Sequence, residues 1–125
     1  MLLIDAANVV GSRPVAPPAV RPGAARELTT RVRQAAVAGT LQPPVVLVLE
    51  GRAKQGVEEG VADGVEVVHA AGEGDDTLAA LAAASDQPVV LVSADRGLAE
   101  RARRSGAEVV GPTWLLDQLP PRPAR

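Results

Sequence analysis

Short apolar runs alternate along the chain with longer segments in which apolar residues recur every three or four positions. The apolar runs predict strands at 2–4, 45–49, 65–68, 88–92 and 108–110. The second of these, VVLVL, is apolar at every position, which is typical of a parallel strand buried on both faces. The helical spacing predicts helices at 24–38, 75–84, 96–105 and 112–119. This alternation predicts an α/β fold, a three-layer α/β/α sandwich around a mostly parallel sheet of about five strands.

Proline and glycine mark the predicted connections. Four prolines make 11–23 a predicted loop, and the polar, glycine-punctuated stretch 51–64 predicts a loop or a short helix. We expect one domain over 1–119 and a flexible, Pro/Arg-rich tail at 120–125. In the last helix, Trp114 is expected to anchor the helix in the core.

Composition limits the kinds of metal site that the chain can form. Of 125 residues, 46% are hydrophobic and 22% are charged, which is the balance of a globular chain. With no cysteine and one histidine, a metal would have to be held by oxygen, which favours Mg²⁺, Mn²⁺ or Ca²⁺. The first residues carry Asp5 inside a short apolar run. We therefore expect no signal peptide, no membrane partner and a cytoplasmic location.

The charges are unevenly distributed. The net charge is −2, which argues against a simple basic wrapper for nucleic acid. Arginines gather in the first third and again near the end, and acids concentrate between them. A solvated surface is the simpler interpretation for most of these residues. The functional interpretation is an acidic centre flanked by arginines that meet phosphate groups.

Carboxylates follow several predicted strands. Asp5 follows the first strand, Glu50 the second and Asp95 the fourth, while Asp75 and Asp76 open the helix that leads into the fourth. Ligands of such sheets bind outside the carboxyl ends of the strands, so we expect these acids to converge there. Clustered carboxylates repel one another unless a cation neutralises them. Two Mg²⁺ or Mn²⁺ ions could activate a water against a phosphodiester.

Each acid also has a structural alternative. Asp75 and Asp95 could simply cap the helices that follow them, and Glu50 could pair with a basic residue just after it. No clear helix follows Asp5, which favours a functional role for that residue. The functional interpretation depends on the acids occurring together.

Four further residues are candidates for substrate binding. Asn8 and Ser93 lie close in sequence to the acids, and Arg13 and Arg96 could contact phosphate. The alternatives are a local turn for Asn8, a satisfied strand end for Ser93 and solvated surface for the two arginines.

These motifs resemble a known family. LIDAANVVG at 3–11 resembles the opening strand and D-x-x-N motif of NYN domains, a branch of the PIN-like nucleases. VSADRGL at 92–98 and SGAEVV at 105–110 are similar to its later strand end, helix and turn into the last strand. GDDTL at 74–78 resembles its middle acid, and LEG at 49–51 a strand end that often reads Phe-Asp-Gly in relatives.

The resemblance implies an endoribonuclease that hydrolyses RNA with Mg²⁺ or Mn²⁺. Asp5, Asp95 and one of Asp75 or Asp76 would be the metal ligands, and Asn8 would contact the substrate or a ligand. Glu50 stands where relatives carry Asp. The chain has no Phe or Tyr to stack on bases, so single-stranded RNA would be held by arginines and backbone in a salt-sensitive way.

The sequence excludes two common nucleotide-binding functions. The chain lacks a P-loop and the glycine-rich turn of a dinucleotide-binding domain. Two alternatives remain open: a degenerate PIN-like module that binds RNA or protein without cutting, and a toxin held by a protein inhibitor. A homodimer is compatible with each of them.

Overall fold

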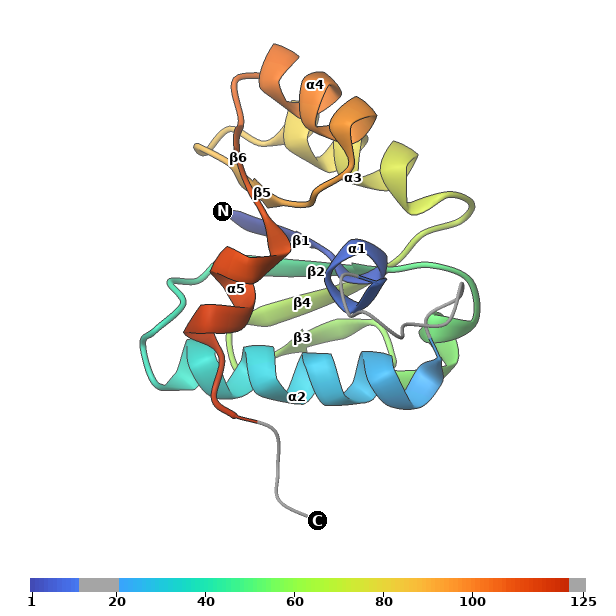
Figure 1. The fold of residues 1–125 in the computed structure, drawn as a ribbon, viewed down its shortest axis with the longest axis vertical. Coiled ribbons are helices and arrows are strands. Elements are labelled where there is room, and N and C mark those ends of the chain that lie inside the picture. Colours follow the sequence, from blue (N-terminus) through green and yellow to red (C-terminus); the bar gives the residue numbers. More distant parts are fainter. Residues whose placement is uncertain (12–20, 122–125) are drawn as a thin grey trace.

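The computed structural model describes residues 1–11 and 21–121, which form one six-stranded sheet flanked by helices (Figure 1). The strands are β1 Leu2–Asp5, β2 Val45–Leu49, β3 Gly60–Ala62, β4 Val65–His69, β5 Val90–Val92 and β6 Glu108–Val110. The helices are α1 Ala6–Gly11, α2 Pro22–Val37, the 3₁₀ helix η1 Gly51–Gly56, α3 Gly74–Ala84, α4 Arg96–Arg104 and α5 Pro112–Gln118. The strand order is β3-β4-β2-β1-β5-β6, and every neighbouring pair is parallel except β3 with β4.

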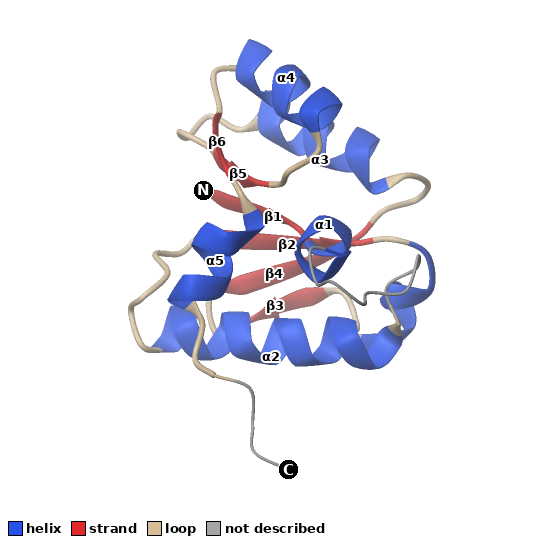
Figure 2. Ribbon diagram, viewed as in Figure 1, coloured by secondary structure: helices blue, strands red, loops and turns tan. Residues whose placement is uncertain are grey.

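Helices cover both faces of the sheet, as expected for three layers (Figure 2). Alternate residues of β1 enter different cores: Leu2 and Ile4 pack with α1, α2 and α5, whereas Leu3 packs with α3 and α4. Because both faces are covered, the central strands are apolar at every position. The predicted α/β sandwich with a mostly parallel sheet is confirmed.

The sheet has one strand more than expected. Within the segment predicted as loop or short helix, η1 is followed by β3, a short exposed edge strand antiparallel to β4. Asp63 and Gly64 join the two strands with positive φ angles of 55° and 80°, as a two-residue hairpin turn requires. An Asp-Gly pair between two strands is a known hairpin signal, so the sequence did contain evidence for β3.

One helix was not predicted, and another begins earlier than the spacing predicted. α1 starts directly after Asp5, which contradicts the expectation that no helix follows that residue. It is only six residues long, so no repeating apolar spacing reveals it. α2 begins at Pro22, inside the predicted loop, because proline suits the first turn, where its missing N–H is no loss.

The prediction for Trp114 was wrong. Its side chain is 40% exposed, and Leu115 is the fully buried residue of α5. Pro112, Leu115 and Leu119 recur at helical spacing on the buried face, and Trp114 lies off that stripe.

The start of the predicted tail packs against α2. Arg31 Nε donates to the carbonyl of Pro120 at 2.9 Å, so the first residue of the predicted tail is bound to α2. Most of the predicted loop at 12–20 and the end of the tail at 122–125 lie outside the described residues. Across the described ranges, no helix combines the length and apolar character needed to cross a bilayer.

Candidate functional site

Carboxylates follow the four adjacent strands β4, β2, β1 and β5 at one edge of the sheet. Asp5 ends β1, Glu50 follows β2 directly, and Asp95 lies three residues beyond β5. Asp75 lies in the first turn of α3, the helix that follows β4. Neighbouring strands are about 4.8 Å apart, so this topology brings acids distant in sequence to one edge.

Asp5 is the most buried of these acids, at 5% exposure. Its Oδ2 accepts a hydrogen bond from Ser93 Oγ at 3.0 Å, and its Oδ1 accepts one from the Asn8 backbone N–H at 3.3 Å. Burial raises the pKa of Asp5 from 3.8 to about 6. The two hydrogen bonds lower this pKa, and the negative charges of Asp75 and Glu50 raise it. The fold thus holds a carboxylate that ionises less readily than an exposed Asp and that a nearby positive charge would stabilise.

Ser93 and Asn8 connect Asp5 to the loop after β5. Ser93 Oγ donates to Asp5 and also accepts from the backbone N–H of Asp95 at 3.1 Å. Asn8 Oδ1 accepts from the backbone N–H of Ala94 at 2.7 Å. Ser93 is only 3% exposed, and both of its contacts are internal. These two side chains, proposed from sequence as substrate contacts, hold the ends of β1 and β5 together.

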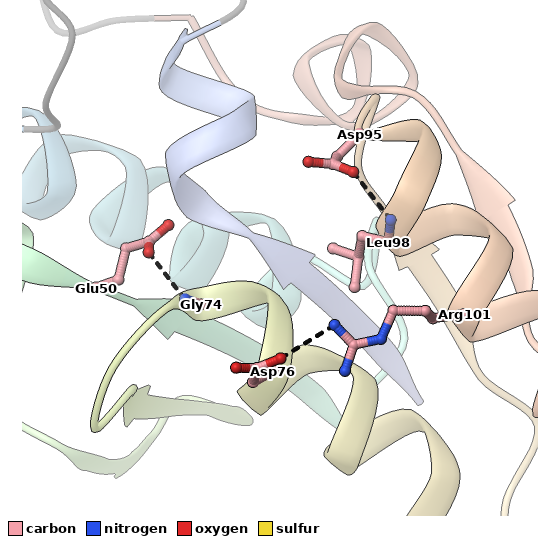
Figure 3. Close-up of polar contacts among 6 residues, drawn as sticks. All are labelled: Glu50, Gly74, Asp76, Asp95, Leu98 and Arg101. Carbon is pink, nitrogen blue, oxygen red and sulfur yellow. Dashed lines mark hydrogen bonds and ion pairs between the residues drawn. The ribbon is translucent and has the colours of Figure 1, made fainter.

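Asp95 caps α4, as its structural alternative proposed. Its Oδ1 accepts from the backbone N–H of Leu98 at 2.9 Å, which satisfies one of the free donors of the first turn (Figure 3). Capping occupies one carboxylate oxygen in this contact. It therefore orients the side chain at the sheet edge without excluding a second role for the other oxygen.

This geometry predicts different stabilities for two Asp95 variants. Asp95→Ala removes the cap and is expected to lower the unfolding free energy by about 1 kcal/mol, whereas Asp95→Asn keeps an acceptor and stays within a few tenths of wild type. Urea denaturation at pH 7.5 measures both. Equal stability of Asp95→Ala and wild type would show that the cap contributes nothing.

Glu50 holds the start of α3 rather than a basic neighbour. Its Oε2 accepts from the backbone N–H of Gly74 at 2.8 Å (Figure 3). A Cβ at position 74 would lie 3.0 Å from Glu50 Oε1, so a glycine permits this close approach. Glu73, the N-cap of α3, makes no side-chain capping bond, and Glu50 supplies the acceptor instead. The ion pair that was the alternative for Glu50 is absent from the described part of the chain.

The Asp75-Asp76 doublet divides between two environments. Asp76 Oδ1 pairs with Arg101 NH1 at 3.1 Å on the surface, and the Asp76 side chain is 74% exposed (Figure 3). The pKa of Asp75 is raised, first by desolvation and then by the negative charges of Asp95, Glu50 and Glu73, while Arg101 lowers it. Asp75 therefore belongs electrostatically to the acid group at the sheet edge. No hydrogen bond of its side chain occurs within 1–11 and 21–121.

The other candidates contribute less to this arrangement. Arg96 is exposed at the start of α4, and Arg13 lies outside the described residues. The sequence interpretation gave Gly74 no role and considered Lys54 only as an ion-pair partner for Glu50. Lys54 Nζ donates to the carbonyl of Ala70 at 3.0 Å and ties η1 to the end of β4. A glycine directly before an acid doublet was the available signal for Gly74, whereas nothing in the sequence indicated the contact of Lys54 with Ala70.

The donor set fits a hard divalent cation in type, because it consists of carboxylate oxygens. Asp75 and the second oxygens of Glu50 and Asp95 make no hydrogen bond in the described residues. Among those residues, however, no three His, Cys, Asp or Glu side chains gather closely enough to hold one ion together. The arrangement fits an ion that keeps most of its waters and takes one or two carboxylates, which is the usual habit of Mg²⁺.

Comparison with known proteins finds a similar fold among solved structures. No family model matches the chain, and no curated protein matches its sequence. Among solved structures, it is similar to a mutant of Rae1 (YacP) from Bacillus subtilis, with a TM-score of 0.66 and 18% sequence identity. The match covers 94% of this chain and 72% of that one. At this identity the likeness shows a shared fold.

Proposed function

We propose that the chain is a divalent-metal-dependent ribonuclease, most simply an endoribonuclease, whose site is the acid group at the carboxyl edge of the sheet. The observation that carries the proposal is the placement of acids after four adjacent strands. The negative charges of other acids in this group raise the pKa of both Asp5 and Asp75. The resemblance of the same residues to NYN motifs and the fold shared with Rae1 support it.

The chain's own residues would act by holding and orienting charge. Asp5, Asp75 and Asp95 would be the metal ligands, and Glu50 would keep the start of α3 against the site. Ser93 and Asn8 would hold Asp5 and the loop after β5 in register, so that the ligands are arranged before substrate arrives. A bound Mg²⁺ or Mn²⁺ supplies a water of lowered pKa and neutralises charge on the phosphodiester.

One observation favours a second function, a PIN-like module that binds RNA without cutting it. Within the described ranges, no three acids gather around one point. A site that relies on one or two carboxylates binds its ion weakly, and a chain of this fold could retain RNA binding after losing cleavage. Cleavage and binding must therefore be measured separately.

The acid doublet offers the sharpest test of the nuclease proposal. We expect wild type to cut a labelled single-stranded RNA with Mn²⁺ or Mg²⁺ and not with EDTA. Asp75→Asn should lose at least about tenfold in rate, because it removes a ligand, whereas Asp76→Asn should stay within about twofold, because only a surface ion pair is lost. Initial rates on the same RNA at matched protein concentration measure the difference.

Each other outcome has a definite meaning. Equal loss in the two variants would contradict the assignment of Asp75 alone as ligand. Retained activity in Asp75→Asn would place the site elsewhere. If the wild type cuts RNA with neither Mn²⁺ nor Mg²⁺ but binds it in a filter assay, the binding module is favoured.

A further inference from the structure

A groove separates α2 from the segment that runs from the end of η1 through β3. Its volume is about 390 Å³, and it lies beside the edge strand of the sheet. The residues that matter on its walls are Arg26, Thr30, Arg33, Gly56, Glu58 and Glu59. None of the acids of the candidate site lines it.

Arg33 is the unusual residue of this groove. Its Nε is buried and has no hydrogen-bond partner, and within 1–11 and 21–121 its side chain forms no ion pair. Two other arginines are used by the fold: Arg31 bonds Pro120 and Glu27, and Arg101 pairs with Asp76. The buried Nε is out of a ligand's reach, so a ligand would be bound by the terminal nitrogens of Arg33, which make no hydrogen bond or ion pair within the described residues.

Arg26 presents a second guanidinium to the same groove. Its Nε donates to the carbonyl of Gly56 at 3.3 Å, which anchors the side chain against the end of η1. In the described residues its terminal nitrogens make no hydrogen bond or ion pair. Arg26 and Arg33 are seven positions apart on α2, so they lie on one face about 10 Å from each other.

The remaining polar groups do not compete for these donors. The hydroxyl of Thr30 already donates to the carbonyl of Arg26 at 3.0 Å. Glu58 and Glu59 are exposed, and Glu59 Oε2 accepts from the backbone N–H of His69 at 2.8 Å. The groove therefore offers the terminal nitrogens of two guanidiniums to an anionic ligand, with two exposed carboxylates on the same walls.

The groove begins close to the acid group. η1 runs from Gly51, next to Glu50, to Gly56 on the groove wall. Its six residues rise by about 2 Å each, so the two sites lie roughly 12 Å apart along η1. Figure 1 shows η1 beside the first turn of α2, at the end of the sheet where β1 leads into α1. A strand of RNA leaving the acid group would reach Arg26 within a few nucleotides.

We propose that this groove binds backbone phosphates of the RNA strand that is cut at the acid group, with Arg26 nearer the site and Arg33 farther along. The inference rests on the proposed function. An acid group repels phosphate, and the chain as a whole carries a net charge of −2, so RNA binding requires local positive charge near the site. The two arginines of the groove would supply it. Phosphate oxygens would accept from the terminal nitrogens of both guanidiniums, a contact that arginine suits geometrically.

The test is RNA binding in EDTA, where cleavage is excluded. The protein carrying both Arg26→Gln and Arg33→Gln is compared with wild type and with a control carrying Arg103→Gln and Arg104→Gln, two exposed residues of α4. Losing two phosphate contacts should weaken binding roughly tenfold at 0.1 M salt and reduce the slope of log K against log salt by about 1.4. The control removes the same charge and should change the slope by less than half of that amount.

Three results would overturn or separate the claims. Wild-type affinity and slope in the groove variant, with RNA cleavage intact, would overturn the groove and leave the nuclease standing. Equal loss in the control would show a general charge effect and also overturn the groove. A wild type that neither binds nor cuts RNA would remove both proposals. If the double variant unfolds, Arg33→Gln alone serves, because its Nε has no internal bond to lose.

Discussion

Asp5→Asn is expected to abolish RNA cleavage while making the folded protein more stable. The substitution keeps the size of the side chain and removes the charge proposed to bind the cation, so the cleavage rate should fall by more than about a hundredfold. The folded state gains because it no longer holds a buried carboxylate at 5% exposure. Loss of activity together with gain of stability distinguishes a site residue from a merely structural one.

The gain should depend on pH in a defined direction. The pKa of Asp5 is about 6 in the folded state against 3.8 ordinarily, so the folded state holds the proton more tightly than the unfolded chain. The contribution of Asp5 to the free energy of unfolding is therefore present below pH 4 and is lost as pH rises through 6. The total loss is roughly 3 kcal/mol. Part of this gain is offset because Asn accepts fewer hydrogen bonds, so we expect about 1–3 kcal/mol in favour of Asp5→Asn at pH 8.

Urea denaturation of both proteins between pH 4 and pH 8 measures the difference. Asp86→Asn is the matched control, since Asp86 is an exposed acid at the opposite edge of the sheet, just before β5. A stability difference that does not change with pH would contradict the raised pKa. Wild-type cleavage by folded Asp5→Asn would rule out the proposed site.

Gly56→Ala is expected to lower the unfolding free energy by about 2–3 kcal/mol, the largest loss predicted for any single methyl group here. A Cβ at Gly56 would overlap the backbone carbonyl of Pro22, and backbone cannot turn aside as a side chain does. Either η1 or the first turn of α2 must move. Thermal or urea unfolding measures the loss.

Gly72→Ala is the matched control for this effect. A Cβ at Gly72 would meet nothing within 4 Å, so its stability should stay within about 0.5 kcal/mol of wild type. If the two variants unfold together, the contact between η1 and α2 is not as close as described. That result would also weaken the groove proposal, because Gly56 lies on the groove wall.

Much of the fold was readable from local pattern. The VVLVL run required a sheet covered on both faces, and Leu28, Val32, Ala35 and Ala36 correctly identified the buried face of α2. Prediction failed where elements were too short for a period to appear, as in α1 and β3. It failed at Trp114 because size and hydrophobicity do not say which side of a short helix a residue occupies.

The candidate site was also predictable only in part from the sequence. The order of elements and the rule of strand ends were enough to propose that Asp5, Glu50, Asp75 and Asp95 share one edge. Which member of the doublet faces that edge was not decidable, because adjacent helical residues point about 100° apart and the helix can rotate freely in a sequence argument. In the folded chain, Asp76 pairs with Arg101, whereas Asp75 lies where the charges of Asp95 and Glu50 raise its pKa.

By itself, the sequence determined the class of fold, the oxygen-only donor set and the positions of the acids relative to the strands, because these depend on residue type and local order. Only the tertiary structure decided that Glu50 binds Gly74, that Ser93 and Asn8 join Asp5 to the loop after β5, and that Arg33 is left without a partner. These contacts join residues up to 88 positions apart. Their formation depends on how helices pack on the sheet, which no local pattern encodes.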